Sequence, residues 1–515
     1  MSPDDGDPLV LFSTRNQVHM HFVYSVCSYL LSLHDIPSLF FFKNEAHEEY
    51  FPTLKINGYP VTNSLDQLNK ITTHDGRSEG LNFQWIIEPE RKIIRTEQMP
   101  NVNVYWAIQE TLRKSNRRYN LDFQDSETLD KLDRTILTAD IVLYYCQLLN
   151  EYARKNDKDL KIVGWESPYV PNAIFLMYCN YAASNERLEY VHITPGVSSF
   201  FGVPHGSRLY ITNFTRKQID VPLVITNDDF QFYEQDSNQR GIGYEEMKSQ
   251  VEDTMESKLN PDRVPEKFMG DGHQQEELIE SIATYRERGN HTFALYSHLF
   301  FDGVLFDTGP AFEDMCDWIR TTIEIFRGRD DLLLLKPHPT EKNPGQPSME
   351  PEETLREFVS DIHLTDNIRL LEPWEISSSR LYNHIDCGLI WRSNAAIEML
   401  YLDVPLIVSG PIRFREALDM QIVESKEQYE NYIDNPSNWT TMTQEEKRQV
   451  VKYLYFYENY LHLEFPYVDV DYYEPLENST SWNEPKLEQL LKEGDRTLEQ
   501  FLLREIRSDE SVELG

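Results

Sequence analysis

Apolar and polar positions alternate along this chain in a way that predicts strands and helices in succession. Up to about residue 210, short apolar runs of strand length alternate with segments whose apolar residues recur every three or four positions. The expected strands are 9–13, 38–42, 160–165 and 189–194, and the expected helices are 19–33, 135–152 and 171–183. Strands joined by helices favour a parallel sheet wrapped by helices in this region.

A second α/β series follows a more polar stretch. Charged and amide residues with weak periodicity fill 228–287, which predicts a junction between domains. Beyond it we expect strands at 292–297, 331–335, 368–371, 385–390 and 405–409, helices at 314–326 and 394–402, and helices again at 444–460 and 485–506. The last of these could pack back across the first region. The predicted domains are a Rossmann-like domain at 1–230, a junction at 231–287, a second Rossmann-like domain at 288–434 and a helical acidic extension at 435–515.

Charge narrows the classes of partner. The 515 residues carry 49 Lys and Arg against 86 Asp and Glu, a net charge of −37, with 40% hydrophobic residues. That apolar content supports packed cores and excludes a disordered chain. Since no block of basic residues is present, we expect no nucleic-acid partner. Only 20 of the basic residues are Lys, and this low-Lys, acidic composition favours an origin in strong salt.

The segments that target or anchor proteins are not recognisable in this sequence. The start of the chain lacks the basic flank and apolar core of a signal peptide, and no apolar run has the length of a membrane span. Five scattered cysteines, with no C-x-x-C pair, suggest neither a disulfide framework nor a zinc site. We therefore expect a cytoplasmic protein with reduced thiols.

The segment Lys336-Pro337-His338-Pro339 directly follows an apolar strand. Because ligands of open α/β sheets bind outside the carboxyl ends of the strands, Lys336 and His338 are candidates to hold phosphate oxygens and a sugar hydroxyl. The two prolines stiffen the turn and limit where His338 points. A purely structural role of His338 at the strand end is an equally simple interpretation.

A second candidate is the strand-to-helix junction that begins at Trp391. Unpaired N–H groups and the helix dipole favour an anion there, with Arg392 supplying charge and Ser393 and Asn394 in the opening turn. Glu398, about one turn further on, could accept hydrogen bonds from two ribose hydroxyls. Alternatively, Ser393 is an ordinary N-cap and Glu398 a solvated helix residue.

Two further loops follow strands of the second series. Ser297, His298 and Asp302 lie after its first strand, where they would cover a bound pyrophosphate or monophosphate. Glu372 follows another apolar run, in a loop that could present its backbone and Trp374 to a base. Simple structural or turn roles compete with each of these assignments.

The order and spacing of these elements, from about Phe293 to Arg415, resemble the capsule polysaccharide biosynthesis family, the Kps-type glycosyltransferases of surface-glycan synthesis. The resemblance implies a GT-B fold, in which two Rossmann-like domains face a cleft and the second domain holds a nucleotide-sugar donor. It also implies that His338, Ser393 and Glu398 are donor-site residues. Lys336 stands where relatives often carry Arg, and related motifs recur in teichoic-acid polymerases.

The acceptor side must be argued from chemistry, because the first domain resembles the family only in architecture. An inverting transfer needs a carboxylate or an imidazole to take the acceptor's proton. Glu166, just after an expected strand, and His192, within the next one, are the candidate catalytic residues, and His19 and His21 are their rivals. A retaining transfer would need no such base.

Together these expectations describe a glycosyltransferase that moves a sugar from a nucleotide-sugar donor to a glycan or lipid-linked acceptor, in surface polysaccharide or glycoprotein glycan synthesis. A CDP-polyol phosphotransferase of teichoic-acid type and a non-catalytic glycan-binding or scaffold protein are the alternatives. We expect no cofactor and no metal, since Lys336, Arg392 and helix termini could neutralise a leaving phosphate. A lipid-linked acceptor would bring the protein to the inner face of the membrane.

Overall fold

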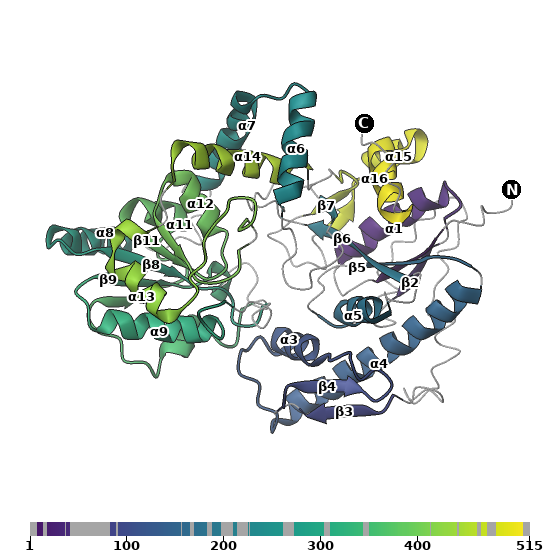
Figure 1. Cartoon of the computed structure of the whole chain (residues 1–515), viewed down its shortest axis with the longest axis horizontal. Coiled ribbons are helices and arrows are strands. Elements are labelled where there is room, and N and C mark those ends of the chain that lie inside the picture. Colours follow the sequence, from purple (N-terminus) through teal and green to yellow (C-terminus); the bar gives the residue numbers. More distant parts are fainter. Residues whose placement is uncertain are drawn as a thin grey trace.

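The computed structural model describes most of the residues of the chain. They are 8–13, 18–36, 38–41, 83–88, 91–155, 157–164, 169–182, 188–196, 210–213, 225, 227–260, 272–302, 309–342, 350–412, 414–439, 442–460, 465–470 and 480–507. Two five-stranded sheets organise them, each covered by helices, which confirms the predicted mixed α/β class (Figure 1). Within the described ranges, no helix is long and apolar enough to cross a membrane.

The first sheet has the strand order β2-β1-β5-β6-β7. Its strands are β1 (Leu9–Ser13), β2 (Ser38–Phe41), β5 (Leu160–Gly164), β6 (Leu188–Gly196) and β7 (Tyr210–Asn213). The pairs are parallel except β6–β7, which is antiparallel. The apolar runs of β1 and β5 are buried along their whole length, as expected of strands covered on both faces.

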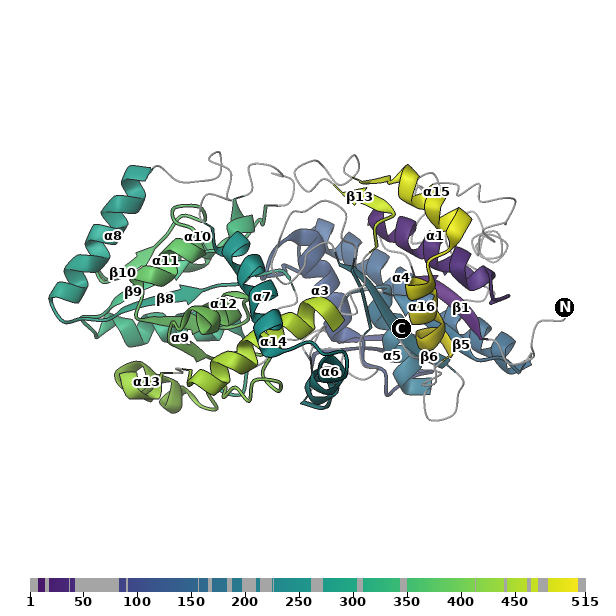
Figure 2. The ribbon, with the colours of Figure 1, turned by 90° about the horizontal axis from the view of Figure 1, so that it is seen from above.

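Helices cover both faces of the first sheet. One face packs on α3 (Tyr105–Asn116), α4 (Ser126–Lys155) and α5 (Asn172–Ala182), beside the hairpin of β3 (Trp85–Glu88) and β4 (Ile93–Thr96). The other packs on α1 (Val18–Ser32) and on the end of the chain: β13 (Val468–Val470), β14 (Thr480–Trp482), α15 (Glu484–Glu493) and α16 (Arg496–Arg507). Figures 1 and 2 show α15 and α16 beside α1, so the last helices return to the first sheet. We call this whole assembly the first-sheet region.

The second sheet is entirely parallel, in the order β10-β9-β8-β11-β12. Its strands are β8 (Thr292–Tyr296), β9 (Leu332–Lys336), β10 (Ile368–Leu370), β11 (Cys387–Ile390) and β12 (Leu406–Val408). One face packs on α9 (Met315–Arg327), α10 (Leu355–Val359) and α13 (Lys426–Asp434). The other packs on α11 (Ser378–Leu381), α12 (Ala395–Leu402) and α14 (Gln444–Tyr460). With its short 3-10 turns at Pro339–Glu341, Tyr382–His384 and Pro436–Asn438, this assembly is the second-sheet region.

Helix α9 shows how the sequence pattern produces an element. Its apolar stripe, which includes Trp318 and Phe326, is buried against the sheet. Asp314 caps its start by accepting a hydrogen bond from the backbone N of Asp317 at 2.9 Å, and Gly328 ends it. The helix predicted at 314–326 is therefore confirmed.

The polar stretch around 231–287 is helical, although its periodicity is weak. It contains α6 (Asn227–Gln239), α7 (Tyr244–Leu259) and α8 (Gly272–Glu287). Helices α6 and α7 pack on α14 and extend the second-sheet core, as both views show. Only Phe230 and Ser237 of α6 are buried, so few positions of this helix carry the apolar signal.

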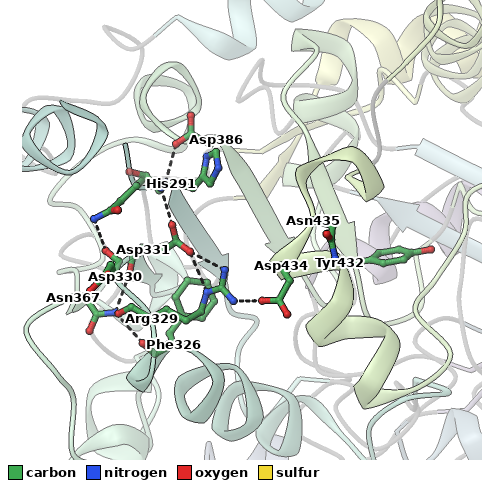
Figure 3. Close-up of polar contacts among 12 residues, drawn as sticks. His291, Phe326, Arg329, Asp330, Asp331, Asn367, Asp386, Tyr432, Asp434 and Asn435 are labelled. Atoms are coloured by element: carbon green, nitrogen blue, oxygen red, sulfur yellow. Dashed lines mark hydrogen bonds and ion pairs between the residues drawn. The ribbon is translucent and has the colours of Figure 1, made fainter. Parts of the chain in front are cut away.

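A polar network holds together the amino ends of the second sheet (Figure 3). The guanidinium of Arg329 donates to the Asp331 carboxylate at 2.8 and 3.0 Å and also pairs with Asp434. The side-chain amide of Asn367 donates to the carbonyl oxygens of Phe326, Arg329 and Asp331 at 2.9–3.0 Å. This network lies at the edge opposite to the carboxyl ends of the strands.

Candidate functional site

The strand order of the second sheet defines where a ligand would bind. The chain runs outward from β8 through β9 to β10, and then returns to β11 on the other side of β8. Ligands of such sheets bind outside the carboxyl ends where this reversal occurs. Ser297 and His298 directly follow the end of β8, and Arg392 and Ser393 follow the end of β11 after one intervening residue. Both pairs therefore lie at the point where the strand order reverses.

Two imidazoles lie together at this edge. The rings of His298, after β8, and His338, after β9, have centroids 5.7 Å apart. His338 Nδ1 accepts a hydrogen bond from the backbone N of Thr340 at 3.2 Å, which places its proton on Nε2 in the neutral ring. His298 Nδ1 lies 3.3 Å from the carbonyl oxygen of Leu299, to which it donates in the neutral form. The pair therefore offers one Nε2 donor and one Nε2 acceptor.

Both imidazoles are neutral at physiological pH. Burial, reinforced by the Arg392 guanidinium, lowers the pKa of His298 to about 4. Burial and the neighbouring His298 lower the pKa of His338 to about 3. Arg392 thus acts electrostatically on His298, and Ser393 follows Arg392 directly in the chain.

Of the two polar side chains that precede α12, one makes a hydrogen bond within the chain and the other makes no capping hydrogen bond. Ser393 Oγ accepts a hydrogen bond from the backbone N of Ala395 at 3.1 Å, although the N-cap residue of α12 is Asn394 and not Ser393. Asn394 is exposed and makes no capping hydrogen bond through its side chain. Helix α12 is eight residues long and begins beside the reversal point.

Two residues of the first-sheet region, Lys114 and Tyr169, contact this site at Asp302. The Asp302 carboxylate accepts hydrogen bonds from the ammonium of Lys114 on α3 and, at 2.6 Å, from the hydroxyl of Tyr169. Partial desolvation opposes the ionisation of Asp302, but the positive charge of Lys114 and the interaction with His298 outweigh it and hold the pKa of Asp302 well below its ordinary value. Asp302 is therefore an anion bound from across the interface.

Lys336 and Ser297, two other predicted site residues, donate hydrogen bonds to backbone carbonyl oxygens near the carboxyl ends of neighbouring strands. Lys336 is 3% exposed, and its Nζ donates to the carbonyl oxygen of Pro373 at 2.6 Å. Burial lowers its pKa to about 8, although the carboxylates of Glu375 and Glu341 oppose the shift. Ser297 donates through both its N and its Oγ to the carbonyl oxygen of Lys336 at 3.3 Å. Both side chains are thus directed at the backbone rather than at the imidazole pair.

Glu398 and Glu372 have partners of their own. Glu398 Oε1 lies 2.7 Å from Lys258 Nζ, and Oε2 accepts a hydrogen bond from the hydroxyl of Tyr382 at 2.6 Å. A ribose would have to share or replace these contacts. Glu372 is exposed and pairs with Arg356.

The predicted catalytic residues cannot be placed beside the site. Glu166 lies outside the described residues. His192 belongs to β6, where its backbone pairs with Gly164, but its side chain is outside the described part of the chain, as are those of His19 and His21 on α1.

Sequence reasoning missed Lys114, Tyr169 and Lys258. Lys114 lies in the last turn of α3, a helix that was not predicted, and Lys258 lies in the stretch predicted to be a junction. No signal in the sequence links either lysine to its carboxylate partner, which lies 188 residues away for Lys114 and 140 for Lys258. Among the residues described, no group of three or more His, Cys, Asp or Glu side chains could hold a metal ion.

Comparisons with known proteins give low similarities. No family model and no curated protein matches the chain. A β-Kdo 2,7 transferase, KpsC of Thermosulfurimonas dismutans, is 12% identical, covers 67% of this chain and 89% of its own, and has a TM-score of 0.29. The N-terminal domain of Candida albicans trehalose-6-phosphate phosphatase (10%, 88% and 92%, 0.30) and S. aureus MnaA with UDP (10%, 86% and 91%, 0.27) are comparable. TM-scores of this size assign no function to this chain.

Proposed function

We propose that the protein transfers a sugar from a nucleotide-sugar donor and binds the donor at the carboxyl ends of the second sheet. The observation that carries the proposal is the neutral His298–His338 pair at the reversal of strand order. Two cations act on His298: Arg392, which follows β11, and Lys114 from the first-sheet region. An anionic, hydroxyl-rich ligand suits this combination of cations and neutral donors and acceptors.

The imidazoles would perform distinct tasks. His338 Nε2–H is the donor, and we assign it to a phosphate oxygen or a sugar hydroxyl. His298 Nε2 is the acceptor, and we assign it to a donor hydroxyl. Arg392 and the start of α12 would stabilise the charge that develops on the leaving phosphate. Because these groups are fixed before the reaction, they cost little reorganisation in the transition state.

The acceptor would bind on the first-sheet region. In an inverting transfer, Glu166 or His192 would take the acceptor's proton, as the chemistry of the sequence suggests. The side-by-side sheets, joined by Lys114 and Tyr169 at Asp302, support a GT-B arrangement with a domain on each side of the reaction.

The finer features follow the resemblance to Kps-type enzymes. We propose the predicted domain boundaries, a metal-independent reaction without a cofactor, a glycan or lipid-linked acceptor, and a role in surface-glycan synthesis at the cytoplasmic face of a membrane. Identifying the donor and the acceptor would test the proposed acceptor class and the proposed role in surface-glycan synthesis.

A ligand panel tests the proposal. Thermal unfolding of the full chain is measured with UDP-, GDP- and CMP-sugars and with CDP-polyols, and we expect one class of nucleotide sugar to raise the midpoint. His338→Ala should abolish that rise, whereas His363→Ala, an exposed imidazole of the same region, should keep it. Turnover of the same sugar donor then completes the test.

The other outcomes identify the alternatives. A rise in the midpoint and turnover with CDP-polyols alone would replace glycosyl transfer by phosphotransfer. If no member of the panel stabilises the protein, the donor site proposed here is wrong, and glycan binding without nucleotide would favour a scaffold.

A further inference from the structure

The candidate donor site needs more positive charge than its predicted residues provide. A nucleoside diphosphate brings at least two negative charges to the site, and both imidazoles are neutral at physiological pH. The ammonium of Lys336 is enclosed and donates to the carbonyl oxygen of Pro373. Of the residues predicted from the sequence, Arg392 is then the half-buried cation that acts on His298.

A second cation comes from the other region. Lys114, in the last turn of α3, contacts the Asp302 carboxylate and acts electrostatically on His298. Its Nζ lies 5.0 Å from the centre of the Tyr169 ring. The side chains of Lys114 and Asp302 are 31% and 35% exposed, so solvent, and hence a ligand, reaches the pair.

The end of α3 is held firmly against the second-sheet region. The backbone N atoms of Tyr119 and Asn120, just after α3, donate to Glu353 Oε2 at 2.8 and 3.0 Å. These hydrogen bonds hold the backbone near Lys114 at the interface, while the four-carbon side chain of Lys114 can rotate.

Resting on the function proposed above, we infer that Lys114 is a phosphate-binding residue supplied by the first-sheet region, and that Asp302 is the counter-ion it leaves when a donor phosphate binds. The exchange replaces one anion by another around the ammonium, which keeps a charged partner throughout. Asp302 keeps the hydroxyl of Tyr169 as a hydrogen-bond donor after the exchange.

The inference makes two variants act in opposite directions. Lys114→Ala removes the cation, so affinity for nucleotide should fall about 10- to 100-fold, the range for losing a charge-assisted contact. Asp302→Asn removes the competing anion but keeps an oxygen for Tyr169, so affinity should stay equal or rise. Lys114→Arg should retain most of the affinity, since it preserves the charge.

Calorimetric titration of the full chain with UDP, GDP and CMP provides the measurement. Arg118→Ala is the matched control, because it removes an exposed ion pair of the same interface that involves neither Lys114 nor Asp302. It should leave affinity unchanged. Unfolding midpoints without nucleotide separate a folding defect from a binding defect, and if Lys114→Ala does not fold, Asp302→Asn alone decides.

The outcomes distinguish the two proposals. If none of the three nucleotides binds the wild-type chain, the proposed donor site itself fails. If wild type binds but Lys114→Ala matches Arg118→Ala, or if Asp302→Asn weakens binding as Lys114→Ala does, the Lys114–Asp302 contact is structural and this inference alone is overturned.

Discussion

Burial sets the ionisation of single side chains around the carboxyl ends of the second sheet. Glu341, 6% exposed, accepts a hydrogen bond from the backbone N of Leu355 at 2.9 Å, while its Oε1 has no hydrogen-bond partner. Burial raises the pKa of Glu341 from 4.5 to about 7. A raised pKa contributes stability that is full below pH 4.5 and is lost as the pH rises through about 7.

Glu341→Gln should remove this loss. At pH 8 the variant should unfold with a free energy higher than wild type by on the order of 2 kcal/mol, because the neutral amide avoids burying a charge while an oxygen still accepts from Leu355. At pH 5 the gain should nearly vanish. Urea unfolding at both pH values checks this, with the exposed Glu324→Gln as a control that changes little. Equal gains at both pH values would contradict the assigned ionisation.

At the residue scale, the sequence predicted where side chains stand better than what they contact. His298 and His338 follow apolar strands, and parallel strands place such residues at a common edge, so their proximity was predictable. Lys336 was predicted for the same reason, yet its Nζ turns to a backbone carbonyl. The partners of Lys114 and the burial of Glu341 depend on loops that carry no pattern.

At the scale of elements, apolar signal decides what can be predicted. Strands β8, β9 and β11 are buried along their length and were recognised as apolar runs. Helix α3 was missed because it buries polar residues, among them Gln109, Glu110 and Arg113, beside its apolar ones. When polar residues occupy buried positions, apolar residues no longer recur at the helical spacing from which a helix is predicted.

The junction between α9, β9 and β10 depends on one amide. Asn367→Ala would leave three backbone carbonyls without this donor, so we expect the free energy of unfolding to fall by about 1–3 kcal/mol. Asn435→Ala, whose exposed amide bonds only within its own turn, should cost less than about 0.5 kcal/mol. Urea unfolding measures both. A small effect at Asn367 would mean that water replaces its contacts.

The same variant separates stability from ligand binding. The network around Asn367 lies at the amino edge of the second sheet (Figure 3), whereas His338 follows the end of β9 at the carboxyl edge. Folded Asn367→Ala protein should therefore bind nucleotide as wild type does, and weaker binding would show that the two edges are coupled.

For the whole molecule, net charge outweighs individual ion pairs. With a charge of −37, self-repulsion opposes the folded state, while exposed pairs such as Arg118–Glu352 contribute about 0–1 kcal/mol each. Raising KCl from 0.1 to 1 M shortens the screening length from about 10 to about 3 Å. The midpoint of thermal unfolding should therefore rise with KCl; a fall would mean that attractive pairs dominate. The origin in strong salt stays a prediction from composition.

The arrangement of the two regions was beyond sequence reasoning. The contacts of Arg118, Tyr119 and Asn120 with the segment 350–353 join polar residues that show no periodicity. Their pairing depends on how two folded sheets meet, and no local pattern encodes that. The sequence predicted that the last helix could pack across the first region, but it did not predict the contact of that helix with α1.

That return orders events during synthesis on the ribosome. One face of the first sheet is completed by Leu498, Phe501 and Leu502, which are translated more than 450 residues after β1. Folding during translation usually proceeds from the first domain made. Here the second sheet has all its strands and facing helices earlier, so it can reach its native packing while the older sheet still waits for its last helix.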